Sequence, residues 1–384
     1  MDRGRKQLIM RKVIYTMAAL ALLASCAKSV TDSDPQRAKR SFEAWVQIRC
    51  PEARNEDNQP MNWNDGSVEN YFGVYLDPSY EVEGTGASVS DSNYVRVRFT
   101  SHTVAGYIAS TTEKDTLEKV GRYKAQNYYG PVVWDKSSES SLYGGLRRAL
   151  RGMKEGGKRR VFVPFWLMST SYYATNREYF NAASTTNGTR QYELEVLDGI
   201  SSVKKWCIDS MARYVAAHPT YPHATSDPDV PAELARFVRA RSGSADTTAL
   251  GWWYQRLVQP TKLKRLPNDT TVYVRYVGRL PNGKVFDTNV LDTARKYGIY
   301  SSSASYTPMQ IKMAAEHYDI KYISSSDGSE NSLVSGFTYT LRNMHPGEGG
   351  VSLFHQGMGY SYSSTERIPS YSPLIFELQL VAKP

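Results

Sequence analysis

The sequence predicts an α+β protein with two β-rich units joined by a helical linker. At 384 residues the chain exceeds one ordinary core, because domains usually hold about 100 to 200 residues. Its 28 tyrosines and its frequent Gly-, Ser-, Thr- and Asn-rich stretches favour strands and turns. Two segments, starting near residues 80 and 251, also show the same order of strand, helix and strand. This long repeat indicates a duplicated domain.

The first 25 residues predict a signal peptide. Basic residues precede an apolar run at 13–25 that is too short to span a bilayer. The run ends in Leu23-Ala24-Ser25-Cys26, which resembles the lipobox of bacterial lipoproteins. The resemblance implies lipidation of Cys26 and anchoring in the cell envelope. Because Ala27, and no Asp, follows the Cys, we expect the outer membrane, with either the periplasmic or the external face possible.

Composition excludes several classes of function. Without residues 1–25 the formal charge falls from +9 to +5, and the basic residues are scattered, so we expect no nucleic-acid partner. The six histidines show no metal-ligand spacing, and no metal site is predicted. Of the cysteines that remain, Cys50 and Cys207 are expected either to pair or to stay as buried thiols. The sequence leaves the oligomeric state open.

The expected organisation follows in chain order. Residues 26–79 should form a tether and a helix near 35–50, where Phe42, Trp45, Val46 and Ile48 fall on an apolar stripe that Pro51 ends. Residues 80–200 and 251–384 should form the two repeated units. The linker at 201–250 should contain helices at 202–218 and 232–242. The expected strands and turn-linked helices of the two units are 94–100, 142–164 and 191–197 in the first, and 272–278, 333–355 and 374–381 in the second.

The second unit resembles an FKBP-type peptidyl-prolyl cis-trans isomerase over roughly 130 residues. The ordered marks are VRYVG, NGKVFDT, LVSGF, LRNMHPGE, MGYS, RIPSYSP and LIFELQL. The resemblance implies, for each unit, an antiparallel sheet wrapped on a short helix. It also implies an apolar pocket in the second unit, which needs no cofactor and acts on proline-containing polypeptides. By position, the catalytic residues would be Tyr276, Phe286, Asp287, Phe337, Tyr360 and Phe376, and the substrate-binding residues Leu333, Val334 and Ile368.

Two positions depart from the family pattern. Phe337 stands where the family usually has Trp, which keeps the aromatic surface but loses an indole N–H. Ser361 replaces the usual Gly after Tyr360. Asp287 follows Phe286 directly, and it is either a turn cap or a carboxylate in the pocket wall that takes a hydroxyl from Tyr276 or Tyr360. Within the ordered set of motifs we favour the pocket interpretation and expect the carboxylate to be partly desolvated.

Rotation of a prolyl bond needs no bond to be made or broken. A dry aromatic pocket that removes water from the prolyl carbonyl and fits the twisted amide would lower the barrier. We expect Tyr360 and the backbone N–H of Ile368 to hold that carbonyl. The envelope setting predicts that the enzyme assists the folding of exported proteins.

Two alternatives to catalysis remain open. The chain could be a non-catalytic FKBP-like binding or chaperone lipoprotein, or a β-sandwich surface lipoprotein that binds glycan through exposed Trp and Tyr. Against the second, Trp252 and Trp253 are expected to precede a strand instead of forming a spaced platform. The first unit lacks the Phe-Asp pair, and we expect it to be a degenerate FKBP-like domain serving as spacer, dimer surface or client platform. The insertion at 290–332 is either a lid or a surface loop without function.

Overall fold

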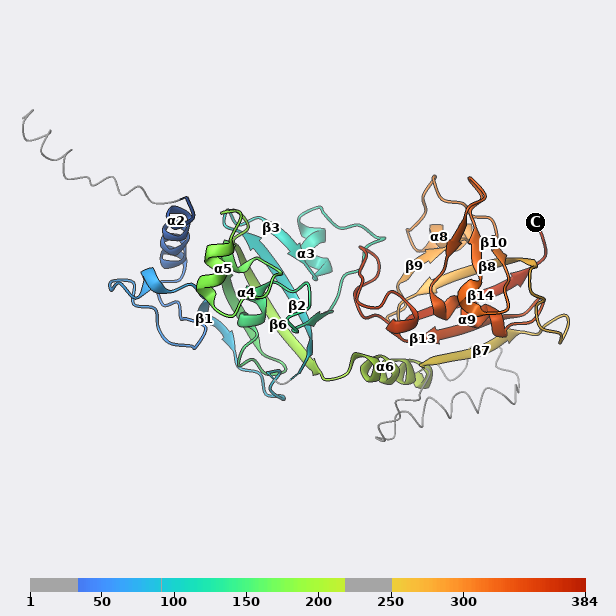
Figure 1. The fold of residues 1–384 in the computed structure, drawn as a ribbon, viewed down its shortest axis with the longest axis horizontal. Helices are drawn as coiled ribbons and strands as arrows, with labels where there is room; N and C mark the ends of the chain where they lie inside the picture. Colours follow the sequence, from blue (N-terminus) through green and yellow to red (C-terminus); the bar gives the residue numbers. More distant parts are fainter. Residues whose placement is uncertain (1–33, 91, 218–250) are drawn as a thin grey trace, which may run out of the picture.

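The computed structural model describes residues 34–90, 92–217 and 251–384. The predicted signal peptide, Cys26 and the expected helix at 232–242 lie outside these ranges. Within them, two separate antiparallel sheets and a few helices confirm the α+β fold class (Figure 1). The described helices include none that is both long and apolar enough to cross a membrane.

The first unit contains a six-stranded sheet with the order β1-β5-β6-β2-β3, and β4 pairs with β2. Its strands are β1 (Tyr75–Val82), β2 (Tyr94–Thr103), β3 (Ile108–Thr111), β4 (Val132–Asp135), β5 (Lys158–Val163) and β6 (Arg190–Ile200). Its helices are α2 (Asp34–Arg49), α3 (Lys114–Lys119), α4 (Gly144–Ala149) and α5 (Asn176–Ala182), with short 3-10 turns η1 (Val68–Asn70) and η2 (Phe165–Leu167).

Helix α2 belongs to the core of the first unit. Phe42 and Val46 are buried there, and the ring of Phe42 meets those of Tyr75 and Trp166 edge to face. Because β1 begins at Tyr75, the expected boundary at residue 79 falls inside a strand. The helix and the chain that follows it are therefore part of the folded unit rather than of a tether.

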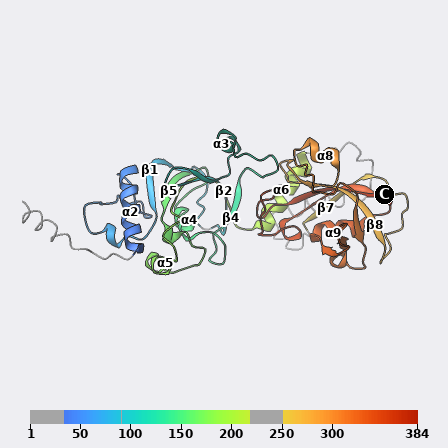
Figure 2. The ribbon, with the colours of Figure 1, turned by 90° about the horizontal axis from the view of Figure 1, so that it is seen from above.

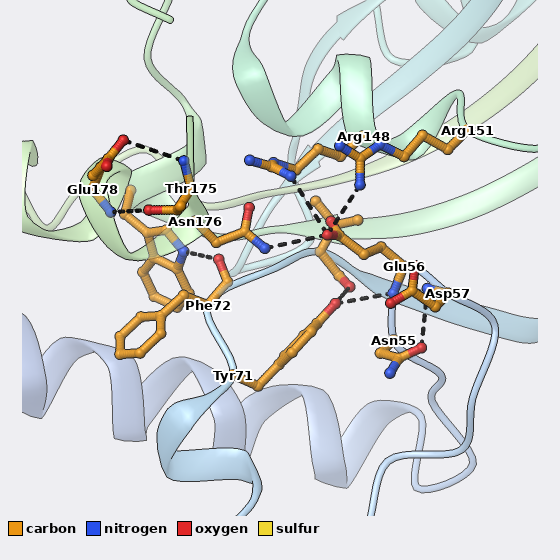
Figure 3. Close-up of polar contacts among 12 residues, drawn as sticks. Asn55, Glu56, Asp57, Tyr71, Phe72, Arg148, Arg151, Thr175, Asn176 and Glu178 are labelled. Carbon is orange, nitrogen blue, oxygen red and sulfur yellow. Dashed lines mark hydrogen bonds and ion pairs between the residues drawn. The ribbon is translucent and has the colours of Figure 1, made fainter. Parts of the chain in front are cut away.

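A buried carboxylate fixes this N-terminal segment to α4 and α5. Glu56 Oε1 lies 3.5 Å from Arg148 Nη1 and 3.3 Å from Arg151 Nη1, and Asn176 Nδ2 donates to it at 3.3 Å. The Glu56 backbone N–H donates to the Tyr71 hydroxyl. Figure 3 shows these side chains converging from three parts of the unit. The cluster therefore joins the irregular stretch after α2 to the helices of the first unit.

The second unit contains an eight-stranded sheet with the order β12-β11-β10-β8-β14-β13-β7, and β9 pairs with β8. Its strands are β7 (Trp252–Val258), β8 (Thr271–Arg279), β9 (Val285–Thr288), β10 (Met309–Lys312), β11 (Lys321–Ile323), β12 (Glu330–Ser332), β13 (Gly349–Phe354) and β14 (Leu374–Val381). Its helices are α8 (Leu291–Lys296) and α9 (Ser335–Asn343), with 3-10 turns η3 (His317–Asp319) and η4 (Gln356–Met358).

The insertion at 290–332 is a structured part of this sheet. It forms α8 and the ladder β10-β11-β12, which continues the sheet outward from β8. Ile311 and Ile320 from the insertion are fully buried in the core. This is a correction to the surface-loop interpretation, because a loop without function would not contribute core residues.

Helix α6 (Val203–Ala217) connects the units, which lie end to end along the long axis (Figure 2). Its residues Ile208, Met211 and Val215 pack against Trp253 of β7 and Ile375 of β14. The linker helix therefore covers one face of the second sheet. The two tryptophans lie within β7 rather than before it, and Trp253 is buried, so the pair forms no exposed aromatic platform for a glycan.

The two cysteines of the described residues lie in different hydrophobic clusters. Cys50 is buried in the core of the first unit and Cys207 is buried on α6, and both are free thiols. The buried-thiol alternative is the one that the structure shows.

The two units share a strand register. Phe99 of β2 pairs with Leu194 of β6, and Tyr276 of β8 pairs with Leu378 of β14. Counting outward from these pairs, β5-β6-β2-β3 of the first unit repeats β13-β14-β8-β9 of the second. Positions in the two sheets can therefore be equated one by one.

Two glycines extend the correspondence to the helices. A Cβ at Gly145 in α4 would lie 2.3 Å from Val163 at the end of β5. A Cβ at Gly336 in α9 would lie 2.3 Å from Phe354 at the end of β13. In both units, one helical glycine allows the helix to approach the same strand, so α4 corresponds to α9.

Candidate active site

Three aromatic rings meet where α9 crosses the second sheet. Side chains alternate between the faces of a strand, so Tyr276 of β8 and Phe376 of β14 both point toward α9. Phe337 projects from the first turn of that helix. Its ring centroid is 5.2 Å from that of Phe376 and 6.0 Å from that of Tyr276. All three are less than a tenth exposed, and they form the floor of the candidate site.

A fourth ring enters from the edge strand β9. Phe286 packs edge to face on Phe376 with a centroid distance of 5.5 Å. The neighbouring strand makes room for it, because a Cβ at Gly278 would lie 2.6 Å from the Phe286 ring. Phe354 of β13 stacks on the other side of Phe376 at 5.7 Å. Phe354 was not among the predicted site residues. The sequence signal that could have indicated it is the uncharged run GGVSLF, which forms a fully buried strand.

Asp287 is attached to this floor by a hydrogen bond. The Tyr276 hydroxyl donates to Asp287 Oδ2 at 2.7 Å, and the Thr288 N–H donates to Oδ1 at 2.9 Å. Asp287 is exposed, which corrects the expectation of a partly desolvated carboxylate. The reason is its position on a short edge strand, where alternate side chains face water. Burial, and then the Asp287 carboxylate, raise the pKa of the Tyr276 hydroxyl, so this hydroxyl stays a proton donor.

The remaining predicted residues surround the floor. Leu333 and Val334 are partly buried against the same cluster, and Ile368 is buried within it. Tyr360 stands at the rim, 40 % exposed. Burial, followed by the charge of Asp287, raises the pKa of Tyr360, which places its ring near that carboxylate. All nine predicted pocket residues therefore come together around one site.

One expected role conflicts with the hydrogen bonds of the rim. The Ile368 N–H donates to Thr365 Oγ1 at 3.0 Å, and the Thr365 N–H donates to the Ile368 carbonyl at 2.9 Å. The Ile368 N–H is therefore engaged within its own turn. It could hold a substrate carbonyl only by exchanging this bond.

One group of potential metal ligands occurs in the described chain, and it lies in the other unit. It consists of Cys50, Glu52 and Asp77. Asp77 already accepts from Ser79 Oγ at 2.5 Å and from Arg160 Nη1 at 3.0 Å. The Arg160 charge therefore already balances this carboxylate.

Residues 263–381 match the family model described as FKBP-type peptidyl-prolyl cis-trans isomerase. This segment is an FKBP-type isomerase domain. The match includes the whole aromatic floor, the Tyr276 and Asp287 pair and the insertion. The first unit and β7 lie outside the matched range. No curated protein matches the chain.

Two solved structures illustrate what the chain resembles. The three FKBP domains of wheat FKBP73 align with 15 % identity over 81 % of this chain and 94 % of that one, with a TM-score of 0.24. A peptidyl-prolyl cis-trans isomerase from Pseudomonas syringae aligns with 20 % identity over 48 % of this chain and 98 % of that one, with a TM-score of 0.26. Superpositions this loose carry no weight, and the assignment of the isomerase domain rests on the family match.

Proposed function

We propose that the isomerase domain catalyses prolyl bond rotation on the floor formed by Tyr276, Phe286, Phe337 and Phe376. The convergence of these rings beside the hydrogen-bonded Tyr276 and Asp287 pair is the observation that supports it. The prolyl ring of a client would lie on the aromatic surface. The rings are apolar and nearly closed to solvent, so a prolyl amide bound there would lose water from its carbonyl.

The proposed mechanism is differential binding of the twisted amide. The barrier to rotation is about 18 to 20 kcal/mol because amide resonance favours the planar forms, and hydration of the carbonyl strengthens that resonance. A dry pocket removes this contribution, and a shape that fits the twisted amide stabilises the transition state over the ground state. Tyr360 supplies a hydroxyl at the rim for the client carbonyl. Asp287 orients the Tyr276 ring by accepting the hydrogen bond of its hydroxyl.

The test is a tetrapeptide isomerisation assay on the full chain, because α6 packs on the second sheet and its removal would expose that face. We expect Asp287→Ala to lower kcat/KM about tenfold and Phe376→Ala to lower it about a hundredfold. The control Asp292→Ala changes an exposed carboxylate on α8 and should leave the rate unchanged. A folded wild-type protein without activity would favour the alternative, a non-catalytic binding or chaperone lipoprotein.

We also propose that the first unit has no isomerase activity. Its register places Phe99, Ala109 and Leu146 where the isomerase domain has Tyr276, Phe286 and Phe337. Two rings and one hydroxyl are lost by these exchanges. Residual activity of the full-length Phe376→Ala variant that Phe99→Ala leaves unchanged would support an inactive first unit, whereas residual activity removed by Phe99→Ala would contradict it.

A lipid-anchored position in the cell envelope is the remaining part of the proposal. Its support is the basic and apolar N-terminus ending in Leu23-Ala24-Ser25-Cys26. There the enzyme would assist proline-limited folding of exported proteins. Mass spectrometry of the mature N-terminus should find a lipid-modified Cys26, and Cys26→Ser should move the protein into the aqueous fraction. An N-terminus that still carries residues 1–25 would contradict the anchor.

A further inference from the structure

A large hollow lies between the two units. Its volume is about 950 Å³, which is at the upper end of the range of about 300 to 1,000 Å³ found for ligand pockets. One side belongs to the first unit and the other to the loop at 356–371 of the isomerase domain. The hollow is separate from the aromatic floor described above. Its lining residues from the first unit include Phe99, Ala109, Ser110, Leu146 and Tyr192.

These five residues are the counterparts of five of the six predicted catalytic residues. The pairing of β2 with β3 and β6, and of β8 with β9 and β14, equates the strand positions. The glycines one position before Leu146 and Phe337 equate the helical ones. The counterparts of the five lining residues, in order, are Tyr276, Phe286, Asp287, Phe337 and Phe376. The hollow is therefore the first unit's version of the isomerase pocket.

Two exchanges leave space in it. Ala109 stands where Phe286 forms part of the isomerase floor, and Leu146 stands where Phe337 does. The aromatic rings that remain form one wall. Phe99 lies 5.3 Å from Trp134 and 6.0 Å from Tyr192, measured between ring centroids. A bound aromatic side chain could replace the missing ring volume and contact these rings edge or face on.

The isomerase domain completes the opposite wall. Tyr362 is 73 % exposed and lines the hollow, together with Tyr371. The Tyr371 hydroxyl donates to Asp135 Oδ2 across the junction at 3.3 Å. The same loop carries Tyr360, which stands at the rim of the isomerase site. One loop therefore lines the hollow and also carries Tyr360 at the rim of the isomerase site.

We propose that this hollow binds an aromatic side chain of an extended polypeptide whose prolyl bond is presented to the neighbouring isomerase site. Tyrosine and serine hydroxyls around the rings can bond the client backbone in several geometries. Ser110 and Tyr362 supply such hydroxyls. The proposal rests on the proposed function for its ligand class, a polypeptide, and for the presentation of the prolyl bond, whereas binding of the aromatic side chain is independent of it.

The test is a binding measurement with a proline-free peptide of about twelve residues, ~40 Å when extended. The probe carries a fluorophore and one tryptophan, and its twin has alanine at that position. Fluorescence anisotropy with the full chain should show the tryptophan peptide binding about tenfold more tightly. Because the probe lacks proline, its binding does not depend on isomerisation. Failure of the peptide to bind would therefore leave the proposed isomerase activity untouched, and loss of that activity would leave binding in the hollow untouched.

Variants locate the binding. Ala109→Phe adds to the hollow a ring equivalent to that of Phe286. Tyr362→Ala removes an exposed wall residue whose loss should not affect folding. Both should weaken binding of the tryptophan peptide about tenfold. Tyr172 is an exposed tyrosine of the first unit that does not line the hollow. The Tyr172→Ala variant should therefore bind the tryptophan peptide as tightly as the wild type does. Equal affinity for both peptides, or undiminished binding by Tyr362→Ala and a folded Ala109→Phe, would overturn the proposal.

Discussion

The contact between Tyr276 and Asp287 joins a buried ring to an exposed charge. The ring lies on the aromatic floor, while the carboxylate remains in water on an edge strand. Asp287 therefore avoids the large cost of a buried charge, yet its hydrogen bond limits rotation of the Tyr276 ring. The same arrangement raises the pKa of Tyr276, first through burial and then through the negative charge of Asp287.

This shift predicts how stability depends on alkaline pH. The raised pKa means that folding favours the neutral phenol, so its contribution is complete below the unfolded pKa of about 10 and is lost as pH rises above it. We expect the difference in unfolding free energy between wild type and Tyr276→Phe to be constant from pH 7 to 9. Above pH 10 it should fall by about 1.4 kcal/mol per pH unit. Urea unfolding across this range measures the difference, and a constant difference up to pH 11 would refute the shift.

Ser361 shows why one departure from the family pattern has a cost. Its φ is 54°, in the left-handed region where a glycine carries no penalty and most other residues lose roughly 1 kcal/mol or more. The usual glycine after the tyrosine therefore suits the backbone better than Ser361 does. Tyr371, whose N–H donates to the Ser361 carbonyl, has a similar φ of 61°. Both strained residues lie in the loop between the two pockets.

Among the elements, α9 depends on its close approach to β13. A Cβ at Gly336 would lie 2.3 Å from Cγ of Phe354, and that ring is fully buried and stacked on Phe376. We expect Gly336→Ala to destabilise the isomerase domain by about 2 kcal/mol through overpacking, although alanine favours a helix by about 1 kcal/mol. Thermal unfolding measures the change. Gly66→Ala, where nothing lies within 4 Å, is the control, and equal midpoints for both variants would contradict the packing argument.

The sequence predicted the positions of several strands and helices better than it predicted the contacts between distant parts of the chain. The strand at 374–381 was expected with the bounds that β14 has, because LIFELQLV is a short, largely apolar run in which only Glu377 and Gln379 are polar. The nine predicted pocket residues lie around one site. The ladder β10-β11-β12 was not expected, since its strands of three or four residues carry little periodicity. The role of Glu56 was also missed, because its partners at 148, 151 and 176 are distant in sequence and only the folded chain brings them together.

The Glu56 cluster predicts that removing this carboxylate lowers the stability of the protein much more than removing the exposed carboxylate of Glu83. The side chains of Glu56 and Arg148 are about a tenth exposed, so Glu56→Ala would leave a nearly buried guanidinium without its carboxylate, at a cost of about 3 kcal/mol. Glu83→Ala removes the partner of Lys154 from an exposed pair and should leave stability unchanged. Chemical denaturation of the full chain compares them. Equal midpoints would show that solvent screens the Glu56 cluster as well.

At the scale of the whole molecule, the units are held together by more than the linker helix. Tyr128 of the first unit packs against the core of the isomerase domain, and its N–H donates to the Glu366 carbonyl at 2.7 Å. The Lys284 ammonium donates to the Ala125 carbonyl. Tyr371 meets the ring of Tyr94 edge on at 5.3 Å, and the Cys207 thiol donates to the Tyr371 carbonyl at 3.2 Å. The junction thus combines backbone, side-chain and ring contacts between the two units.

Tyr371 allows the junction to be tested without disturbing either core. Its positive φ means that glycine keeps the backbone conformation and relieves strain while removing the ring and the hydroxyl. We therefore expect Tyr371→Gly to leave the unfolding of the isomerase domain unchanged or slightly more stable. The contacts to Tyr94 and Asp135 would be lost, so small-angle scattering should give a larger radius of gyration than wild type. Tyr318→Ala, an exposed tyrosine on η3, is the matched control. An unchanged scattering profile for Tyr371→Gly would mean that the contacts of Tyr128 and Lys284 hold the units by themselves, and the hollow would then keep its shape without this ring.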